Sequence, residues 1–77
     1  MDRHELLLRL GKAERRVTEG SKLLAEQRAL IKKMTDEGQD VTAAQSLLTD
    51  CERMQEGHVA DRDRLRRLLL GDAPPSG

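Results

Sequence analysis

The feature that most constrains the fold is a heptad repeat of apolar and small residues between residues 6 and 34. Steps of four and three residues land on one row throughout this stretch: Leu6, Leu10, Ala13, Val17, Gly20, Leu24, Gln27, Ile31 and Met34. A 3.5-residue repeat held over about four heptads is typical of a helix that packs along another helix. The sequence therefore predicts a long helix over residues 3–37 that needs a partner helix.

The composition favours helices throughout the chain. The 77 residues include no Phe, Tyr or Trp, and 36% of them are charged. Strands draw on aromatic and β-branched residues, whereas Leu, Ala, Glu, Lys, Arg and Gln are good helix formers. We expect one small all-α domain with little room for an enclosed pocket.

A second stretch repeats the same spacing and supplies the partner helix. Its expected row is Ala44, Leu47, Cys51, Met54, His58, Asp61, Leu65 and Leu68. Gly38 is suited to end the first helix in the left-handed conformation. Thr42 with Gln45 resembles a capping box that opens the second helix, and Asp40 is an alternative cap.

These signals predict an antiparallel two-helix hairpin within residues 1–71. The turn is expected over 38–41 and the second helix over 43–70. Residues 72–77 contain two prolines and no helical signal, so we expect a disordered tail there.

Folding the chain about the turn pairs residues whose numbers sum to about 78. This register places Gly20 opposite His58, so that a missing side chain faces an imidazole, and Val17 opposite Asp61. We expect the register and turn to depend on Gly20, Gly38, Thr42, His58 and Asp61. The residues expected to pack in or beside the seam are Leu10, Val17, Leu23, Leu24, Leu30, Ile31, Leu48, Met54, Leu65 and Leu68.

Few residues suggest catalysis or metal binding. Cys51 and His58 are about 10 Å apart along a helix, too far for a hydrogen-bonded pair. No second cysteine offers a metal-ligand spacing. We therefore expect a protein that is not an enzyme and has no metal or cofactor site. His58 is expected to hydrogen-bond Glu19 or Asp61, and Asp61 to pair with Arg16 or with an arginine of its own helix.

Two further patterns suggest phosphate chemistry more weakly. The segment His4-Glu5-Leu6 resembles the phosphorylated histidine box of sensor kinases, but the polar residue and proline of that box are missing. Four arginines between residues 62 and 67 could contact nucleic acid, but aspartates interleave with them and no aromatic side chain could stack on bases. Fourteen basic residues also balance fourteen acidic ones, unlike a dedicated nucleic-acid binder.

The setting of the chain is predicted from three negative features. A single cysteine excludes an internal disulfide and favours a reducing compartment. No apolar run approaches the length of a membrane span, and the charged first residues are unlike a signal peptide. We expect a cytoplasmic protein that does not bind membranes or small-molecule substrates.

Four segments resemble small helical-hairpin proteins of rhizobia and related alphaproteobacteria, a group without an assigned activity. The likeness spans about residues 10–69 and implies a helical hairpin in a bacterial cytoplasm, with no functional residues to carry over. The segments are Ala13-Glu14-Arg15-Arg16-Val17-Thr18-Glu19-Gly20, Gln27-Arg28-Ala29-Leu30-Ile31, Asp36-Glu37-Gly38-Gln39-Asp40-Val41-Thr42-Ala43-Ala44 and His58-Val59-Ala60-Asp61-Arg62-Asp63-Arg64-Leu65.

A two-helix hairpin buries little surface, so its fold needs support from outside. The leucines that its seam leaves partly uncovered are Leu7, Leu8, Leu23, Leu30, Leu48, Leu69 and Leu70. We expect a non-enzymatic interaction module, either a homodimer forming a four-helix bundle or a hairpin that binds another helical protein. The alternatives are a small nucleic-acid-binding regulator and, less favoured, a phosphotransfer hairpin.

Overall fold

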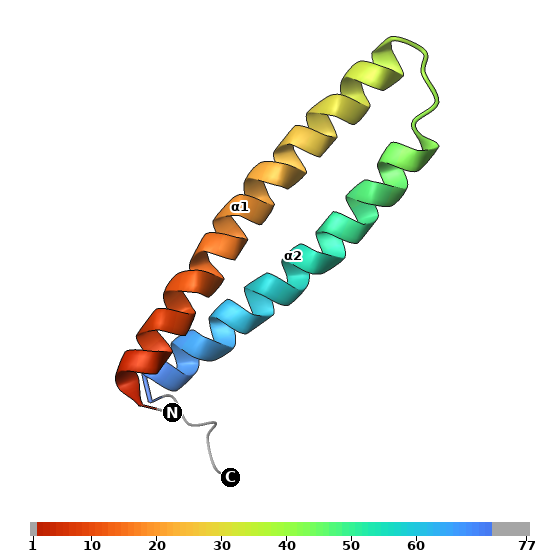
Figure 1. Cartoon of the computed structure of the whole chain (residues 1–77). Helices are drawn as coiled ribbons and strands as arrows, with labels where there is room; N and C mark the ends of the chain where they lie inside the picture. Colours follow the sequence, from red (N-terminus) through yellow and green to blue (C-terminus); the bar gives the residue numbers. More distant parts are fainter. Residues whose placement is uncertain (1, 72–77) are drawn as a thin grey trace.

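The computed structural model, which describes residues 2–71, is an antiparallel hairpin of two long helices. Helix α1 spans Arg3–Asp36 and helix α2 spans Thr42–Leu69. The two helices lie side by side, and the start of α1 lies beside the end of α2 (Figure 1). No strand occurs within residues 2–71. The predicted all-α two-helix fold is confirmed, and the expected tail over 72–77 lies outside the described residues.

Local hydrogen bonds fix both ends of α1. Asp2 is the N-cap, and its carboxylate accepts the Glu5 backbone N–H at 2.8 Å. At the other end Gly38 takes a φ of 73°, which an L side chain would strain. Its N–H donates to the Thr35 carbonyl at 3.0 Å, and the Gln39 N–H donates to the Met34 carbonyl at 2.8 Å. This pair of bonds is a Schellman motif, and it turns the chain back toward α1.

The expected capping box at the start of α2 is wrong. Val41 occupies the N-cap position and offers no side-chain hydrogen bond. Instead, the Asp40 carboxylate accepts the Thr42 backbone N–H at 3.0 Å and the Thr42 hydroxyl at 2.7 Å. The Gln45 N–H, which a capping box would give to the Thr42 hydroxyl, donates to the Val41 carbonyl at 2.8 Å, so Thr42 does not cap. The two bonds from Thr42, the backbone one first, hold the pKa of the Asp40 carboxyl below its ordinary value.

The seam between the helices is thin. Ala13, Leu24 and Leu65 are the buried apolar residues of the described chain. On α1 the expected row faces the partner throughout, since its remaining members are half-buried: Leu6, Leu10, Val17, Gly20, Gln27, Ile31 and Met34. The hairpin thus holds together through one narrow stripe on each helix.

On α2 every second residue of the predicted row is replaced in the packing stripe by the residue that follows it in the sequence. Leu47, Met54 and Leu68 are 49%, 62% and 55% exposed, so their expected place in the seam is wrong. The half-buried or buried residues of α2 that follow the heptad spacing are Ala44, Leu48, Cys51, Gln55, His58, Arg62, Leu65 and Leu69. A search for apolar residues misses this stripe, because it contains the polar Gln55 and excludes the neighbouring, more apolar Met54.

Candidate functional site

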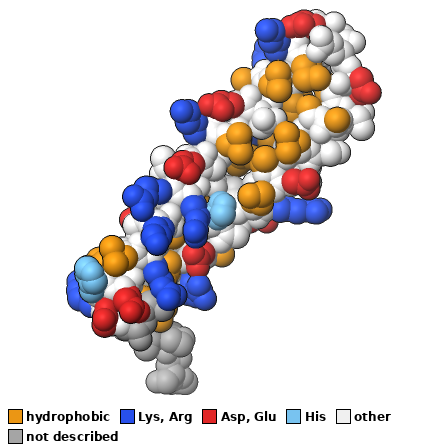
Figure 2. Space-filling model, in the orientation of Figure 1, with side chains coloured by type: hydrophobic (Ala, Val, Ile, Leu, Met, Phe, Trp, Pro, Cys, Tyr) orange, Lys and Arg blue, Asp and Glu red, His pale blue; other side chains and the backbone are white. Residues whose placement is uncertain are grey.

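The hairpin has one broad side on which large apolar side chains stay uncovered. Leu23 and Leu30 on α1 and Leu47 and Met54 on α2 are 43%, 46%, 49% and 62% exposed. We call these four residues the apolar face. Each pair is one heptad apart, so its two members lie on the same side of their helix. Figure 2 shows hydrophobic side chains gathered over the half of the hairpin nearer the turn, with Lys and Arg side chains more numerous nearer the termini.

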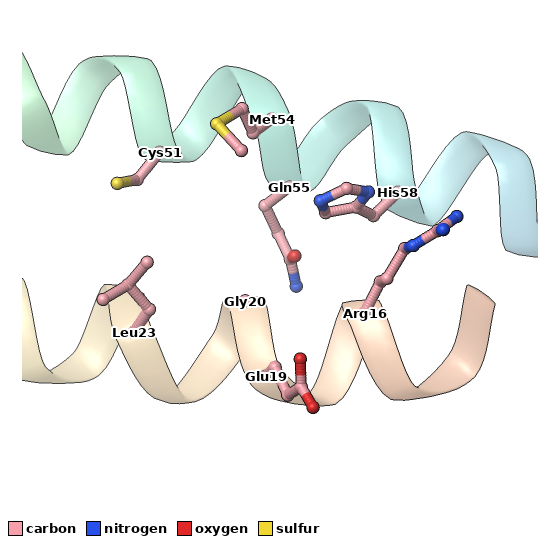
Figure 3. A pocket seen from close by; sticks show the side chains of 8 residues that line it. All are labelled: Arg16, Glu19, Gly20, Leu23, Cys51, Met54, Gln55 and His58. Atoms are coloured by element: carbon pink, nitrogen blue, oxygen red, sulfur yellow. The ribbon is translucent and has the colours of Figure 1, made fainter. Parts of the chain in front are cut away.

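A cleft of about 190 Å³ opens between the helices at the edge of the apolar face. Its lining changes from apolar toward the turn to charged toward the termini (Figure 3). The lining residues are Arg16, Glu19, Gly20, Leu23, Cys51, Met54, Gln55 and His58.

Gln55 is the central residue of this cleft, and Gly20 makes room for it. The Gln55 Nε2 donates to the Val17 carbonyl at 2.8 Å and to the Ser21 hydroxyl at 3.0 Å, so the amide lies against the backbone of α1. A Cβ on Gly20 would overlap the Gln55 side-chain oxygen. That oxygen is buried and has no hydrogen-bond partner among residues 2–71. The pairing of Gly20 with His58 is therefore wrong, since Gln55 fills the space and His58 lies almost one turn further along α2.

In the described part of the chain, His58 and Asp61, the other polar residues on which the register was expected to depend, form none of the hydrogen bonds or ion pairs across the seam that the sequence suggested. His58 lines the cleft, and Arg16 reaches from α1 toward α2 beside it (Figure 3). Asp61 pairs with Arg64 of its own helix at 2.6 Å, which is the second of the two expected alternatives. Within residues 2–71, neither Glu19 nor Asp61 hydrogen-bonds His58.

The opposite broad side is closed by ion pairs between the helices. Arg28 pairs with Glu52 at 3.4 Å, and Glu14 pairs with Arg66 at 3.0 Å. We call these four residues the ion-paired face. All four are at least partly solvated, so each pair contributes little to stability. A second, more open cleft lies on this side, and its lining includes Arg28, Glu52 and Val59.

The remaining candidates for chemistry are dispersed. Cys51 is a free, half-buried thiol. Within residues 2–71, no group of three or more His, Cys, Asp or Glu side chains could hold a metal ion. The arginines at the end of α2 are largely paired, with Arg62 bonded to Asp63 and with Arg64 and Arg66 paired as described above. None of the helices over residues 2–71 has an apolar stretch long enough to cross a membrane.

Two members of this site escaped the sequence reasoning. Gln55 was passed over because it is polar, although it lies four residues after Cys51 and three before His58, which is the heptad spacing. Leu47 was assigned to the seam, although its seven-residue spacing to Met54 repeats that of Leu23 and Leu30. That equal spacing was the signal that the two helices share an outward apolar face.

Comparison with known proteins adds no relatives. No protein-family description, curated protein or solved structure matches this chain. The rhizobial resemblance therefore stays a prediction.

Proposed function

We propose that this protein is a non-enzymatic interaction module that dimerises through its apolar face into a four-helix bundle. The observation that carries the proposal is the position of Leu23, Leu30, Leu47 and Met54 beside the seam, at 43–62% exposure. Positions that flank the seam of a two-helix pair usually carry charged residues. On the opposite side of this hairpin they do so, as Glu14, Arg28, Glu52 and Arg66.

The energetics support a partner for this face. With three buried apolar residues in the described chain, the hairpin alone has little to set against its chain entropy. Covering a half-exposed Leu or Met contributes about 1 kcal/mol, roughly half the value for full burial. A second copy would cover four such side chains on each hairpin, which makes folding and association mutually dependent.

A reducing, cytoplasmic setting is part of the proposal. It is supported by the one cysteine of the sequence, which the structure leaves as a free thiol. Another helical protein could use the same face, but the matched spacing of the apolar pairs on the two helices favours a second copy of this chain.

Sedimentation tests the dimer directly. We expect the wild-type chain to be dimeric at micromolar concentrations and to melt at a lower temperature on dilution. Leu23→Lys with Leu30→Lys should give monomer and lower the melting temperature. The matched control is Leu8→Lys with Leu70→Lys, because both leucines are exposed but lie outside the apolar face. The control should keep the dimer. A wild-type monomer whose melting temperature ignores dilution would contradict the proposal.

A further inference from the structure

We infer that the two hairpins of the proposed dimer pack with their turns at opposite ends, on a twofold axis that passes through Cys51. This inference rests on the proposed dimer and adds its geometry. In a twofold interface every contact occurs twice: if one residue of the first copy contacts another residue of the second copy, the same two residues also meet with the copies exchanged. The arrangement must therefore place apolar groups on apolar groups and must match the charges.

The apolar face is self-complementary about one point on each helix. An axis that crosses α1 midway between Leu23 and Leu30 places Leu23 of one copy on Leu30 of the other. On α2 the corresponding axis crosses between Leu47 and Met54, where Cys51 lies. These two midpoints are at nearly the same height along the hairpin, because Arg28 pairs with Glu52 across the helices. One axis can therefore serve both helices at once.

Charge decides between the two ways of stacking the faces. Residues 20–57, the half nearer the turn, carry five Lys or Arg and seven Asp or Glu. Residues 2–19 and 58–71, the half nearer the termini, carry nine Lys or Arg and six Asp or Glu. With opposed turns the basic half of each copy lies mostly beyond the turn of the other, so the two basic halves stay apart. Turns at the same end would instead place the basic half of one copy on the basic half of the other.

The same axis gives Arg16 a partner. Arg16 lines the charged end of the cleft and has no salt bridge within residues 2–71. Rotation about the axis places it at the height of Glu37 in the second copy, beside the turn.

The copies then overlap over about 20 residues of α1, or about 30 Å, across a width of about 20 Å. That covers about 600 Å² on each copy, which is at the low end for a specific interface.

The two arrangements predict different separations between the Cys51 residues. With opposed turns, the α2 helices of the two copies lie against each other and the thiols meet at the axis. With turns at the same end, the α2 helices lie diagonally across the bundle, about 14 Å apart for helices spaced at about 10 Å. A disulfide requires Cα atoms within about 7 Å, so oxidation distinguishes the two.

The test is oxidation of the purified protein with diamide, followed by non-reducing electrophoresis. Two Cys51 thiols form one S–S bond and transfer two electrons and two protons to diamide, whose N=N bond becomes a hydrazine. The control carries Cys51→Ser and Ser46→Cys, which moves the thiol to an exposed position on α2. We expect most of the wild-type chain to become crosslinked. The rate of crosslinking should be at least tenfold higher than in the control.

The outcomes separate this geometry from the dimer itself. Fast crosslinking through Cys51 with a slow control supports opposed turns. A dimer by sedimentation whose Cys51 crosslinks no faster than the control overturns the geometry and leaves the dimer intact. A monomer by sedimentation overturns both the dimer and this inference.

Discussion

The two broad faces of the hairpin differ at equivalent positions. Beside the seam on one side, Arg28 and Glu52 form an ion pair across the helices, as do Glu14 and Arg66. On the other side the flanking positions nearer the turn carry Leu and Met, about half of whose surface is exposed. A hairpin that only had to close on itself could carry charges on both sides. The ion-paired face is therefore the solvated side in our proposal, and the apolar face is the side that the second copy covers.

The largest expected effect comes from comparing two adjacent leucines, one in the seam and one on the apolar face. Leu24 is 8% exposed, so Leu24→Ala should lower the free energy of unfolding by about 2–3 kcal/mol at any concentration. Leu23→Ala should act mainly where the dimer forms, because its side chain contacts the second copy in the proposed dimer. Leu and Ala are both good helix formers, so helix propensity contributes little to either effect.

Chemical denaturation at two protein concentrations, about 2 and about 200 µM, checks this comparison. The loss caused by Leu23→Ala should grow with concentration, whereas the loss caused by Leu24→Ala should not. Equal concentration dependence for both variants would mean that the seam and the apolar face are not distinct surfaces.

A smaller effect is expected at Gly20 and Gln55, between the two faces. In a Gln55→Ala background, Gly20→Ala should raise stability by about 1 kcal/mol through helix propensity alone. In the wild-type chain the new methyl group displaces the Gln55 amide from the Val17 carbonyl and the Ser21 hydroxyl, which offsets that gain.

A double-mutant cycle of thermal melts measures this coupling, which we expect to be about 1 kcal/mol. If Gly20→Ala stabilises both backgrounds equally, the Gln55 amide does not occupy the space that Gly20 leaves. The apolar face lies outside this contact, so the dimer should persist in all four proteins.

The sequence predicted α1 better than α2 for a physical reason. Along α1 the single apolar residues Leu10, Ala13 and Val17 fix the row before the doublets Leu23–Leu24 and Leu30–Ile31 are reached. Along α2 the leucines come in doublets, Leu47 with Leu48 and Leu68 with Leu69, so they fit either of two stripes one residue apart. Met54 then favours the wrong stripe over the one that contains Gln55. The partner helix decides between them, because the gap at Gly20 accepts the long amide of Gln55. The spacing of apolar residues along one helix does not show how the Gln55 side chain fits against Gly20 of the other helix.

The helix ends show the same limit on a smaller scale. Gly38 could be placed at the end of α1 because a left-handed residue strongly favours glycine. The Thr42 hydroxyl can donate or accept, and its role depends on the residue at which α2 begins: the Gln45 N–H that a capping box would use donates to the Val41 carbonyl at 2.8 Å. Asp40 lies two residues earlier and accepts both Thr42 bonds. Thr42 therefore lies inside α2 as a donor to Asp40, and Val41 takes the N-cap position without a side-chain bond.

The smallest expected effect concerns Asp40 in the turn, which belongs to neither face. Its pKa is lowered from an ordinary 3.8 by the bonds from Thr42, so the ionised form is favoured in the folded state. The stability that it contributes is present above pH 3.8 and is lost as the pH falls through the lowered pKa. Thr42→Val removes the hydroxyl donor but keeps the backbone one, so NMR titration should show the Asp40 pKa rising only part of the way. Sedimentation at neutral pH should be unchanged, because the apolar face is intact. An unchanged Asp40 pKa in Thr42→Val would contradict the role of the hydroxyl bond at the start of α2.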